Sequence, residues 1–187
     1  FDDFLAANAD PGLHRLADVD GARIFPHDPG TLPNREGDGG PDMAEYVRLA
    51  RQGLTDWRDL PGLAEGLRGL EETRRVDLER WLDDLGLDAV VFPAVADVGP
   101  ADADVNQASA DLAWRNGVWV ANGNLAIRHL GIPTVTVPMG LLADIAMPVG
   151  LTFAGRGYDD TALLTHACAF EAIRARRTAP PLTTPMT

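Results

Sequence analysis

Few side chains in this sequence of 187 residues could carry out hydrolytic chemistry. Ser109 is the only serine and Cys168 the only cysteine, and all 16 basic residues are arginine, so the sequence contains no lysine. A serine hydroxyl is a weak nucleophile until a neighbouring base accepts its proton, and no lysine can serve as that base here. Ser109 also lacks the flanking glycines of a nucleophile elbow, and we expect it to cap a helix. The sequence offers no candidate catalytic residue.

An acidic loop imitates the start of a calcium-binding loop. Asp102, Asp104 and Asn106 occupy its first, third and fifth positions. The sixth position requires glycine and the twelfth requires a bidentate glutamate, but Gln107 and Ala113 stand there instead. We therefore interpret this segment as a solvated acidic loop, and we expect no metal ion and no cofactor.

The histidines give no second candidate. They are scattered, and no pair has the i, i+4 spacing of a helical metal site. His166 and Cys168 lie two residues apart on a predicted helix, so their side chains point in different directions. The ordinary interpretation of Cys168 is a buried structural cysteine.

Composition limits the expected partners and location. The formal net charge is −12, which disfavours nucleic acid and anionic membranes because both need a basic surface. No apolar run approaches the roughly 18 residues of a membrane-spanning helix. The single cysteine fits a reducing compartment, from which we predict a cytoplasmic protein. The sequence opens on Phe1 without a secretory signal, which suggests processing, truncation or excision from a longer protein.

Hydrophobic periodicity and the positions of proline and glycine predict the secondary structure. Helices are expected over 42–53, over 71–85 with Gly86 as a carboxy-terminal cap, within 110–130, and from 159 to the arginines at 174–177. Strands are expected over 88–93, 131–138 and 149–155. The residues expected to be buried on helix faces are Leu78, Leu82, Leu85, Leu163, Ala167, Phe170 and Ile173.

These elements predict an α/β fold in which helices cover part of a mixed β-sheet. The strands are apolar along their whole length, so both faces of the sheet should be covered. Residues 134–138 and 149–154 are joined by a short loop and could form an antiparallel hairpin. Three strands make a thin sheet, which suggests that further strands precede Phe1. We divide the chain into a mostly helical and loop segment over 1–87 and a sheet-and-helix core portion over 88–187.

Five pieces of the sequence resemble, in order and in approximate spacing, the carboxy-terminal region of the amidase signature family. They are 88–94 (DAVVFPA), 124–126 (NLA) followed by 131–133 (GIP), 135–140 (VTVPMG), 147–156 (MPVGLTFAGR) and the helix over 159–171. Each piece alone is unspecific, because apolar strands with proline and glycine ends are common, whereas five in order are fairly specific. Residues 1–87 are compatible with the variable middle region of such enzymes.

The resemblance implies one large mixed sheet wrapped by helices and an activity that hydrolyses C–N amide bonds. Enzymes of this family use a nucleophilic serine, a second serine in a cis peptide, a lysine, and a Gly/Ser-rich loop that supplies backbone donors for the oxyanion. A neutral lysine can act as the base when desolvation lowers its pKa, and buried N–H donors stabilise the tetrahedral oxyanion. None of these parts has a counterpart here. We therefore expect the catalytic residues to lie outside this chain.

The resemblance implies that this chain contributes part of the central sheet and one wall of the substrate cleft to a complete enzyme. In open α/β sheets, the residues that face a ligand lie just past the carboxyl ends of strands. The candidates for substrate contact lie in such loops and are Asn122, Asn124, Pro138, Met139, Gly140 and Met147. The alternative interpretation is that the asparagines cap a helix and that Gly140 only turns the chain.

The leading hypothesis is the C-terminal part of an amidase that acts on a small-molecule amide together with a missing N-terminal catalytic half. A homo-oligomer is compatible with this hypothesis. The second hypothesis is a non-catalytic binding or scaffolding protein that retains an amidase-like half-fold, and the lack of lysine and of a second serine favours it. A calcium-binding domain is a third interpretation that rests only on the acidic loop.

Overall fold

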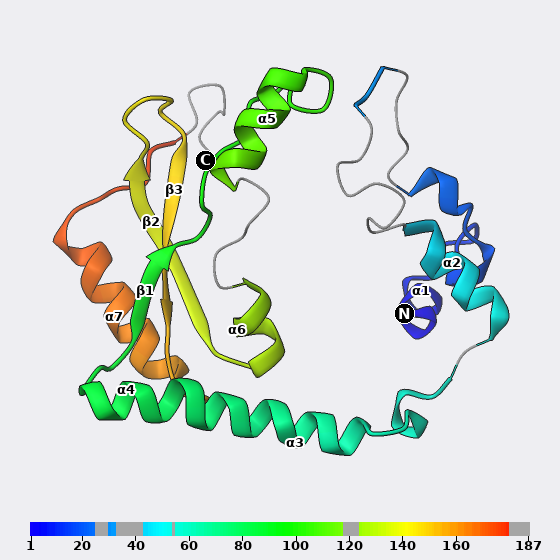
Figure 1. Ribbon diagram of the computed structural model, residues 1–187, viewed down its shortest axis with the longest axis horizontal. Coiled ribbons are helices and arrows are strands. Elements are labelled where there is room, and N and C mark those ends of the chain that lie inside the picture. The colour runs from blue at the N-terminus through cyan, green and yellow to red at the C-terminus, as the bar shows by residue number, and fades with distance from the viewer. Residues whose placement is uncertain (25–29, 33–42, 54, 118–123, 180–187) are drawn as a thin grey trace. The chain divides into compact units, whose positions relative to one another are not determined.

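The computed structural model describes residues 1–24, 30–32, 43–53, 55–117 and 124–179 (Figure 1). The chain divides into two compact units, Phe1–Leu63 with Asp104–Gln107, and Ala64–Ala103 with Ala108–Thr187. The proposed division at residue 87 stays a prediction.

The first unit is helical in its described part. It contains α1 (Asp2–Asn8), α2 (Met43–Gln52) and 3₁₀ turns at Leu16–Asp18, Gly21–Arg23 and Trp57–Asp59. The helix predicted over 42–53 is confirmed as α2, which ends just before Gly53 with a φ of 122°; Asp42, its predicted cap, lies outside the described residues. Arg51 connects α2 to the first turn, because its Nε and Nη2 donate to the carbonyl oxygens of Ala17 and Val19 at 3.0 and 2.9 Å.

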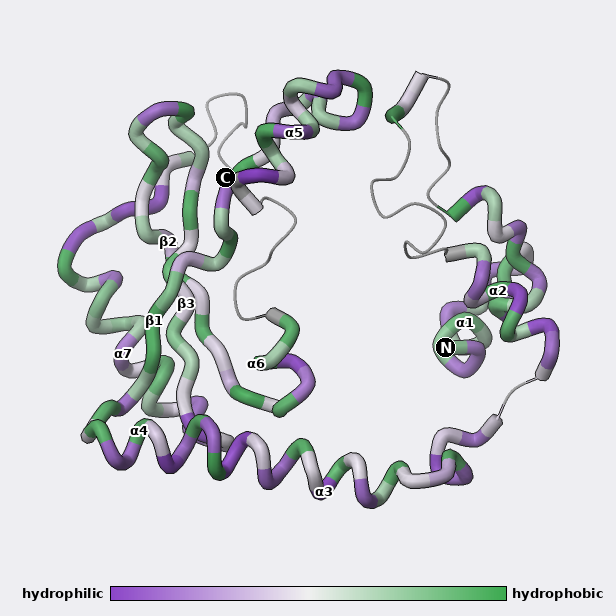
Figure 2. Tube along the Cα trace, in the orientation of Figure 1, coloured by the Kyte–Doolittle hydropathy of each residue, from purple (hydrophilic) through white to green (hydrophobic). Residues whose placement is uncertain are grey.

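A long helix opens the second unit. It consists of α3 (Leu63–Thr73), a π-helical segment (Arg74–Glu79) and α4 (Arg80–Leu85). The prediction that this helix starts at residue 71 is wrong, because it already begins at Leu63. Its predicted end is confirmed: Gly86 adopts a left-handed conformation with φ 65°, and its N–H donates to Asp83. Figure 2 shows hydrophobic and hydrophilic residues alternating along this helix.

The π-helical segment places Arg74 where it meets two distant parts of the second unit. The residue is 8% exposed. Its Nε lies 3.1 Å from Glu79 Oε1, its Nη1 donates to the Leu130 carbonyl oxygen at 3.2 Å, and its Nη2 also contacts Glu71. Glu79 Oε1 in turn accepts the N–H of Gly157 at 2.9 Å. Arg74 therefore connects the long helix directly to Leu130 and, through Glu79, to Gly157.

The sheet has three described strands, β1 (Val90–Pro93), β2 (Thr134–Leu141) and β3 (Pro148–Ala154). They lie in the order β1-β3-β2, and both pairs are antiparallel. The predicted hairpin is confirmed as β2 and β3. The fold is thus α/β with a small antiparallel sheet, and the described strands show no parallel pair that would make the sheet mixed.

One helix, α7 (Asp160–Ile173), packs against β2 and β3. The core between them contains Val137, Phe153, Leu163 and Ala167, with Phe170 at its border. The expectation that both faces of every strand are covered is wrong for β1, where burial alternates and Val91 is 56% exposed. A strand covered on one face alternates in this way although its sequence is apolar throughout.

Three helical residues are more exposed than expected. Ile173 is 72% exposed, Leu85 is 58% exposed and Cys168 is also exposed. Ile173 and Leu85 are the last residues of their helices. The apolar spacing extends to these residues, but the neighbouring elements that bury the rest of the helix face do not reach them. The interpretation of Cys168 as buried is therefore corrected.

Two shorter helices complete the second unit, α5 (Gln107–Asn116) and α6 (Asn124–Leu130). They confirm the helices predicted within 110–130, although α5 starts three residues before that range. Ser109 is the third residue of α5, so its expected role as the residue that caps the helix is wrong.

Candidate functional site

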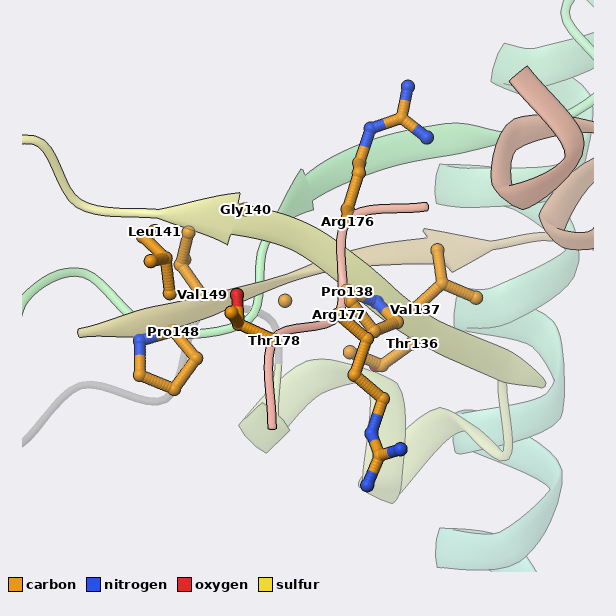
Figure 3. Close-up of a pocket in the computed structure, with 11 residues that line it drawn as sticks. Thr136, Val137, Pro138, Gly140, Leu141, Pro148, Val149, Arg176, Arg177 and Thr178 are labelled. Atoms are coloured by element: carbon orange, nitrogen blue, oxygen red, sulfur yellow. The ribbon is translucent and has the colours of Figure 1, made fainter. Parts of the chain in front are cut away.

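A groove with a volume of about 410 Å³ lies against the β2–β3 hairpin (Figure 3). Its walls come from the hairpin and from the segment that follows α7. The lining residues of the hairpin are Thr136, Val137, Pro138, Gly140, Leu141, Pro148, Val149 and Gly150, and those of the following segment are Arg176, Arg177 and Thr178. The hairpin wall is largely apolar, and the charged side chains among the described lining residues are those of Arg176 and Arg177.

An irregularity in the hairpin shapes this groove. The pairing register between β2 and β3 shifts between Pro138 and Gly140, which makes Met139 an extra residue of a β-bulge. Gly140 has a φ of 149°, a value that side-chain-bearing residues rarely adopt. Proline at 138 has no N–H to donate, and a bulge is one of the few positions in a sheet that tolerate it. The bulge thus brings backbone rather than bulky side chains to the groove wall at residue 140.

The structure brings together only some of the residues predicted to contact substrate. Pro138 and Gly140 line the groove, and Met139 lies between them in the bulge. Met147 lies in the loop of the hairpin, where its carbonyl oxygen accepts the N–H of Leu142 at 2.8 Å. Asn124 is the first residue of α6, and Asn122 lies outside the described residues. Substrate contact by these six residues stays a prediction.

Sequence reasoning missed the arginine wall, because it treated 174–177 only as the positive end of α7. Arg176 lies beyond the helix and folds back, with Nη1 donating to the carbonyl oxygen of Phe170 at 2.7 Å. Its guanidinium carbon lies 3.9 Å from the centre of the Phe170 ring. The helix dipole predicts that a cation near the C-terminus of α7 is favourable. It does not predict which of the arginines contacts the last turn of the helix.

The described lining of the groove offers little for catalysis. Hydroxyl groups come from Thr136 and Thr178. The Thr136 hydroxyl lies 2.9 Å from that of Thr152 on the neighbouring strand, so a second hydroxyl and not a base is its hydrogen-bond partner. Activation of a hydroxyl requires an adjacent base, and the described residues that line the groove include no carboxylate, histidine or lysine.

The described part of the chain contains neither a metal site nor a membrane span. No group of three or more His, Cys, Asp or Glu residues there is arranged to hold a metal ion. None of the helices described is both long and apolar enough to cross a membrane.

Comparison with known proteins gives a partial match. No family model matches the chain. An 86-residue stretch, 46% of the chain, is 34% identical to the A subunit of glutamyl-tRNA(Gln) amidotransferase from two strains of Cereibacter sphaeroides. The chain is distantly similar to amidase signature enzymes. It covers only 16% of the length of these curated relatives.

One solved structure is similar to the chain over a larger share. It is the native peptide amidase from Stenotrophomonas maltophilia, at 24% sequence identity and a TM-score of 0.44, over 71% of this chain and 24% of that enzyme. The sequence similarity to amidase signature enzymes agrees with the resemblance carried by the strand and loop pieces between residues 88 and 171.

Proposed function

We propose that this chain is the C-terminal part of an amidase that hydrolyses C–N amide bonds, and that the serines and the lysine of a Ser-Ser-Lys mechanism are supplied from outside it. The observation that carries this proposal is the 34% identity to an amidotransferase subunit over 86 residues of a chain with no lysine and one serine. An enzyme of this mechanism needs both a base and two hydroxyl groups, so this chain can only contribute in other ways.

Its contribution is to extend a larger, mixed sheet and to supply one wall of the substrate cleft. The bulge residues Pro138, Met139 and Gly140 lie at the groove, where backbone atoms are accessible to a ligand. A largely apolar wall suits the body of a small-molecule amide, while the polar amide group would be held by the catalytic half. The partner is thus a polypeptide with the Gly/Ser-rich loop. We place the complex in the cytoplasm, because a single cysteine fits a reducing compartment.

The first experiment measures hydrolysis of an aryl amide, p-nitroacetanilide, by the chain alone and after mixing with a complementary polypeptide. That polypeptide is the part of the Cereibacter sphaeroides protein that precedes the matched stretch. We expect no hydrolysis above the uncatalysed rate for either component and measurable hydrolysis for the mixture. Turnover by the chain alone would contradict the proposal, because no catalytic group is assigned to it.

A matched pair of glycine variants tests the role of the groove in that mixture. Gly140 and Gly62 both have positive φ, at 149° and 77°, and an added Cβ would meet no atom within 4 Å at either position. Only Gly140 lines the groove. Gly140→Ala should raise KM or lower kcat, whereas Gly62→Ala should leave both unchanged. Equal effects from the two variants would assign them to backbone strain and not to the cleft.

The lack of lysine and of a second serine also favours an alternative, a non-catalytic binding or scaffolding protein with an amidase-like half-fold. This alternative predicts that the chain is monomeric, unfolds cooperatively and binds an amide without any turnover in the mixture. The amidase proposal predicts instead that the isolated chain self-associates or binds the catalytic polypeptide. Sedimentation velocity of the chain, with and without that polypeptide, separates the two.

A further inference from the structure

The segment that follows α7 lies across the hairpin. Arg174 ends the helix in an extended conformation, with φ −168° and ψ 151°. Arg176, Arg177 and Thr178 then form the second wall of the groove. Figure 3 shows this segment crossing β2, with the side chains of Arg176 and Arg177 directed to opposite sides. The groove therefore exists only while the segment lies where it does.

Arg176 attaches this segment to the core. Its Nη1 donates to the carbonyl oxygens of Phe170 and Arg174 at 2.7 and 3.2 Å, and its guanidinium stacks on the Phe170 ring. The Phe170 carbonyl is one of the last four of α7, which have no partner within the helix. The Phe170 ring packs edge-on against Phe153, with centroids 6.0 Å apart. One side chain thus connects the segment to the buried contact between α7 and the sheet.

The backbone contributes little to this attachment. Between residues 174–179 and β2, both of which are described, no backbone hydrogen bond is formed. Arg177 is exposed and forms no hydrogen bond, ion pair or ring contact within the described part of the chain. Cation–π contacts and single hydrogen bonds at partly exposed sites are individually weak. The attachment of the segment to the hairpin and α7 therefore rests mainly on Arg176.

We propose that residues 174–179 are a strap across the hairpin groove, fastened by Arg176 and able to lift from Pro138 and Gly140 while the sheet stays folded. When the strap lifts, the apolar wall of the groove becomes accessible from the side on which Arg177 now lies. This device does not depend on what the groove binds, so it stands or falls separately from the amidase proposal.

Limited trypsin digestion tests the strap, because a protease cleaves a segment faster when the segment leaves the surface of the protein. The bond between Arg174 and Ala175 is measured, since all the variants below retain it. The fragment that ends at Arg174 is quantified by mass spectrometry, and its rate is divided by that of a synthetic peptide of residues 170–179 with the same substitution. Arg176→Ala should accelerate cleavage about fivefold, which corresponds to roughly 1 kcal/mol of lost attachment. Arg177→Ala, the adjacent control, should stay within about twofold of the parent chain.

A second variant and a second measurement guard against a trivial result. Arg176→Lys keeps the charge but loses the planar stacking, so its cleavage rate should lie between those of the parent chain and Arg176→Ala. Hydrogen exchange at the amide of Phe153 should stay slow in Arg176→Ala, because the sheet stays folded. Equal cleavage in Arg176→Ala and Arg177→Ala would overturn the proposal, and so would loss of Phe153 protection, because Arg176 would then hold the core itself.

Discussion

Arg74 is a buried charged residue of the second unit. It contacts two carboxylates and the Leu130 carbonyl, and the segments it joins are 56 residues apart in sequence. Glu79 completes the group, because one oxygen of its carboxylate accepts from both Arg74 and the N–H of Gly157. Removing Arg74 would leave Glu79, which is 22% exposed, without its cation and the Leu130 carbonyl oxygen without this donor, whereas Glu71 is 63% exposed and would return to solvent.

We predict that Arg74→Ala destabilises the chain by roughly 3 kcal/mol, measured as the free energy of unfolding in urea. The next residue is the control. Arg75 forms a similar ion pair with Glu72 at 2.7 Å, but its side chain is 55% exposed. Arg75→Ala should hardly shift the urea midpoint, because solvent screens the pair. Equal shifts for both variants would show that Arg74 is not acting through its burial.

Sequence patterns predicted three of the seven expected buried apolar residues and missed the buried charge. Leu82, Leu163 and Ala167 are buried as expected, whereas Leu85 and Ile173 are exposed at helix ends. Periodicity reports which residues share a helix face but not how far a neighbouring element extends along it. Arg74 was missed because its partners at 130 and 157 come together only through the tertiary fold.

At the scale of elements, the strands were predicted more accurately than the long helix. Proline and glycine mark the ends of the β2–β3 hairpin in the sequence, and its strands lie within three residues of their expected bounds. The helix starts eight residues before the predicted position, because Gly66 and Gly69 lower the helix propensity of α3. Extending an existing helix adds a hydrogen bond per residue, so these glycines are tolerated once α4 and the π-helical segment have formed.

Those two glycines give a prediction of increased stability. An added Cβ at Gly66 or Gly69 would meet no atom within 4 Å. Each substitution to alanine should therefore stabilise the chain by about 0.5–1 kcal/mol, because alanine loses less backbone entropy in a helix. Thermal unfolding followed by circular dichroism measures the gain. A loss of stability in both variants would mean that α3 is not helical in solution.

Gly157 should respond in the opposite direction. An added Cβ there would lie 3.0 Å from Arg74 Nε and 3.1 Å from its Cζ. Gly157→Ala should cost about 1–3 kcal/mol, since the guanidinium must move from its carbonyl and carboxylate partners. In an Arg74→Ala background the same substitution should cost much less, and this non-additivity is the test. Additive effects of the two changes would contradict the close contact.

At the scale of the whole molecule, three carboxylates of the first unit have a lowered pKa. Hydrogen bonds from the guanidinium groups of Arg15, Arg48 and Arg58 lower the pKa values of their partner carboxylates, which are Asp18, Glu45 and Asp56 respectively. A lowered pKa in the folded state stabilises that state above the ordinary value, which is 3.8 for aspartate and 4.5 for glutamate. This stabilisation is lost as the pH falls through the folded pKa.

We therefore predict that acid loosens α2 through its Glu45–Arg48 pair. Amide hydrogen exchange, corrected for its intrinsic pH dependence, should show lower protection within 43–52 at pH 3 than at pH 6. The effect should weaken in salt, because the pair is exposed. The control is Arg48→Ala, in which this change should become smaller. An equal change in Arg48→Ala and in the parent chain would contradict the prediction.

Only one of the two walls of the groove was predicted from the sequence. Pro138 and Gly140 were chosen because they follow the expected end of a strand, but β2 continues to Leu141, so they lie within the strand at its bulge. The rule that ligands lie past strand ends could not find Arg176 or Thr178, because the groove requires a segment 36 or more residues downstream of Gly140 to turn back onto the hairpin, and no local pattern encodes that return. The similarity to amidase signature enzymes was readable because its strand pieces are local and occur in order.

The π-helical turn at Arg74–Glu79 holds one residue more than an ordinary helical path of the same rise. Leu63, Leu67 and Leu70 precede it at spacings that align them with Arg74 along one line of the helix. Deleting a single residue within the turn would let the helix run on without interruption but would rotate everything before it by about 100°. The leucines and Arg74 would then be rotated together relative to α4. Chains of this kind should accordingly vary in length in their loops and stay constant in length between residues 63 and 85.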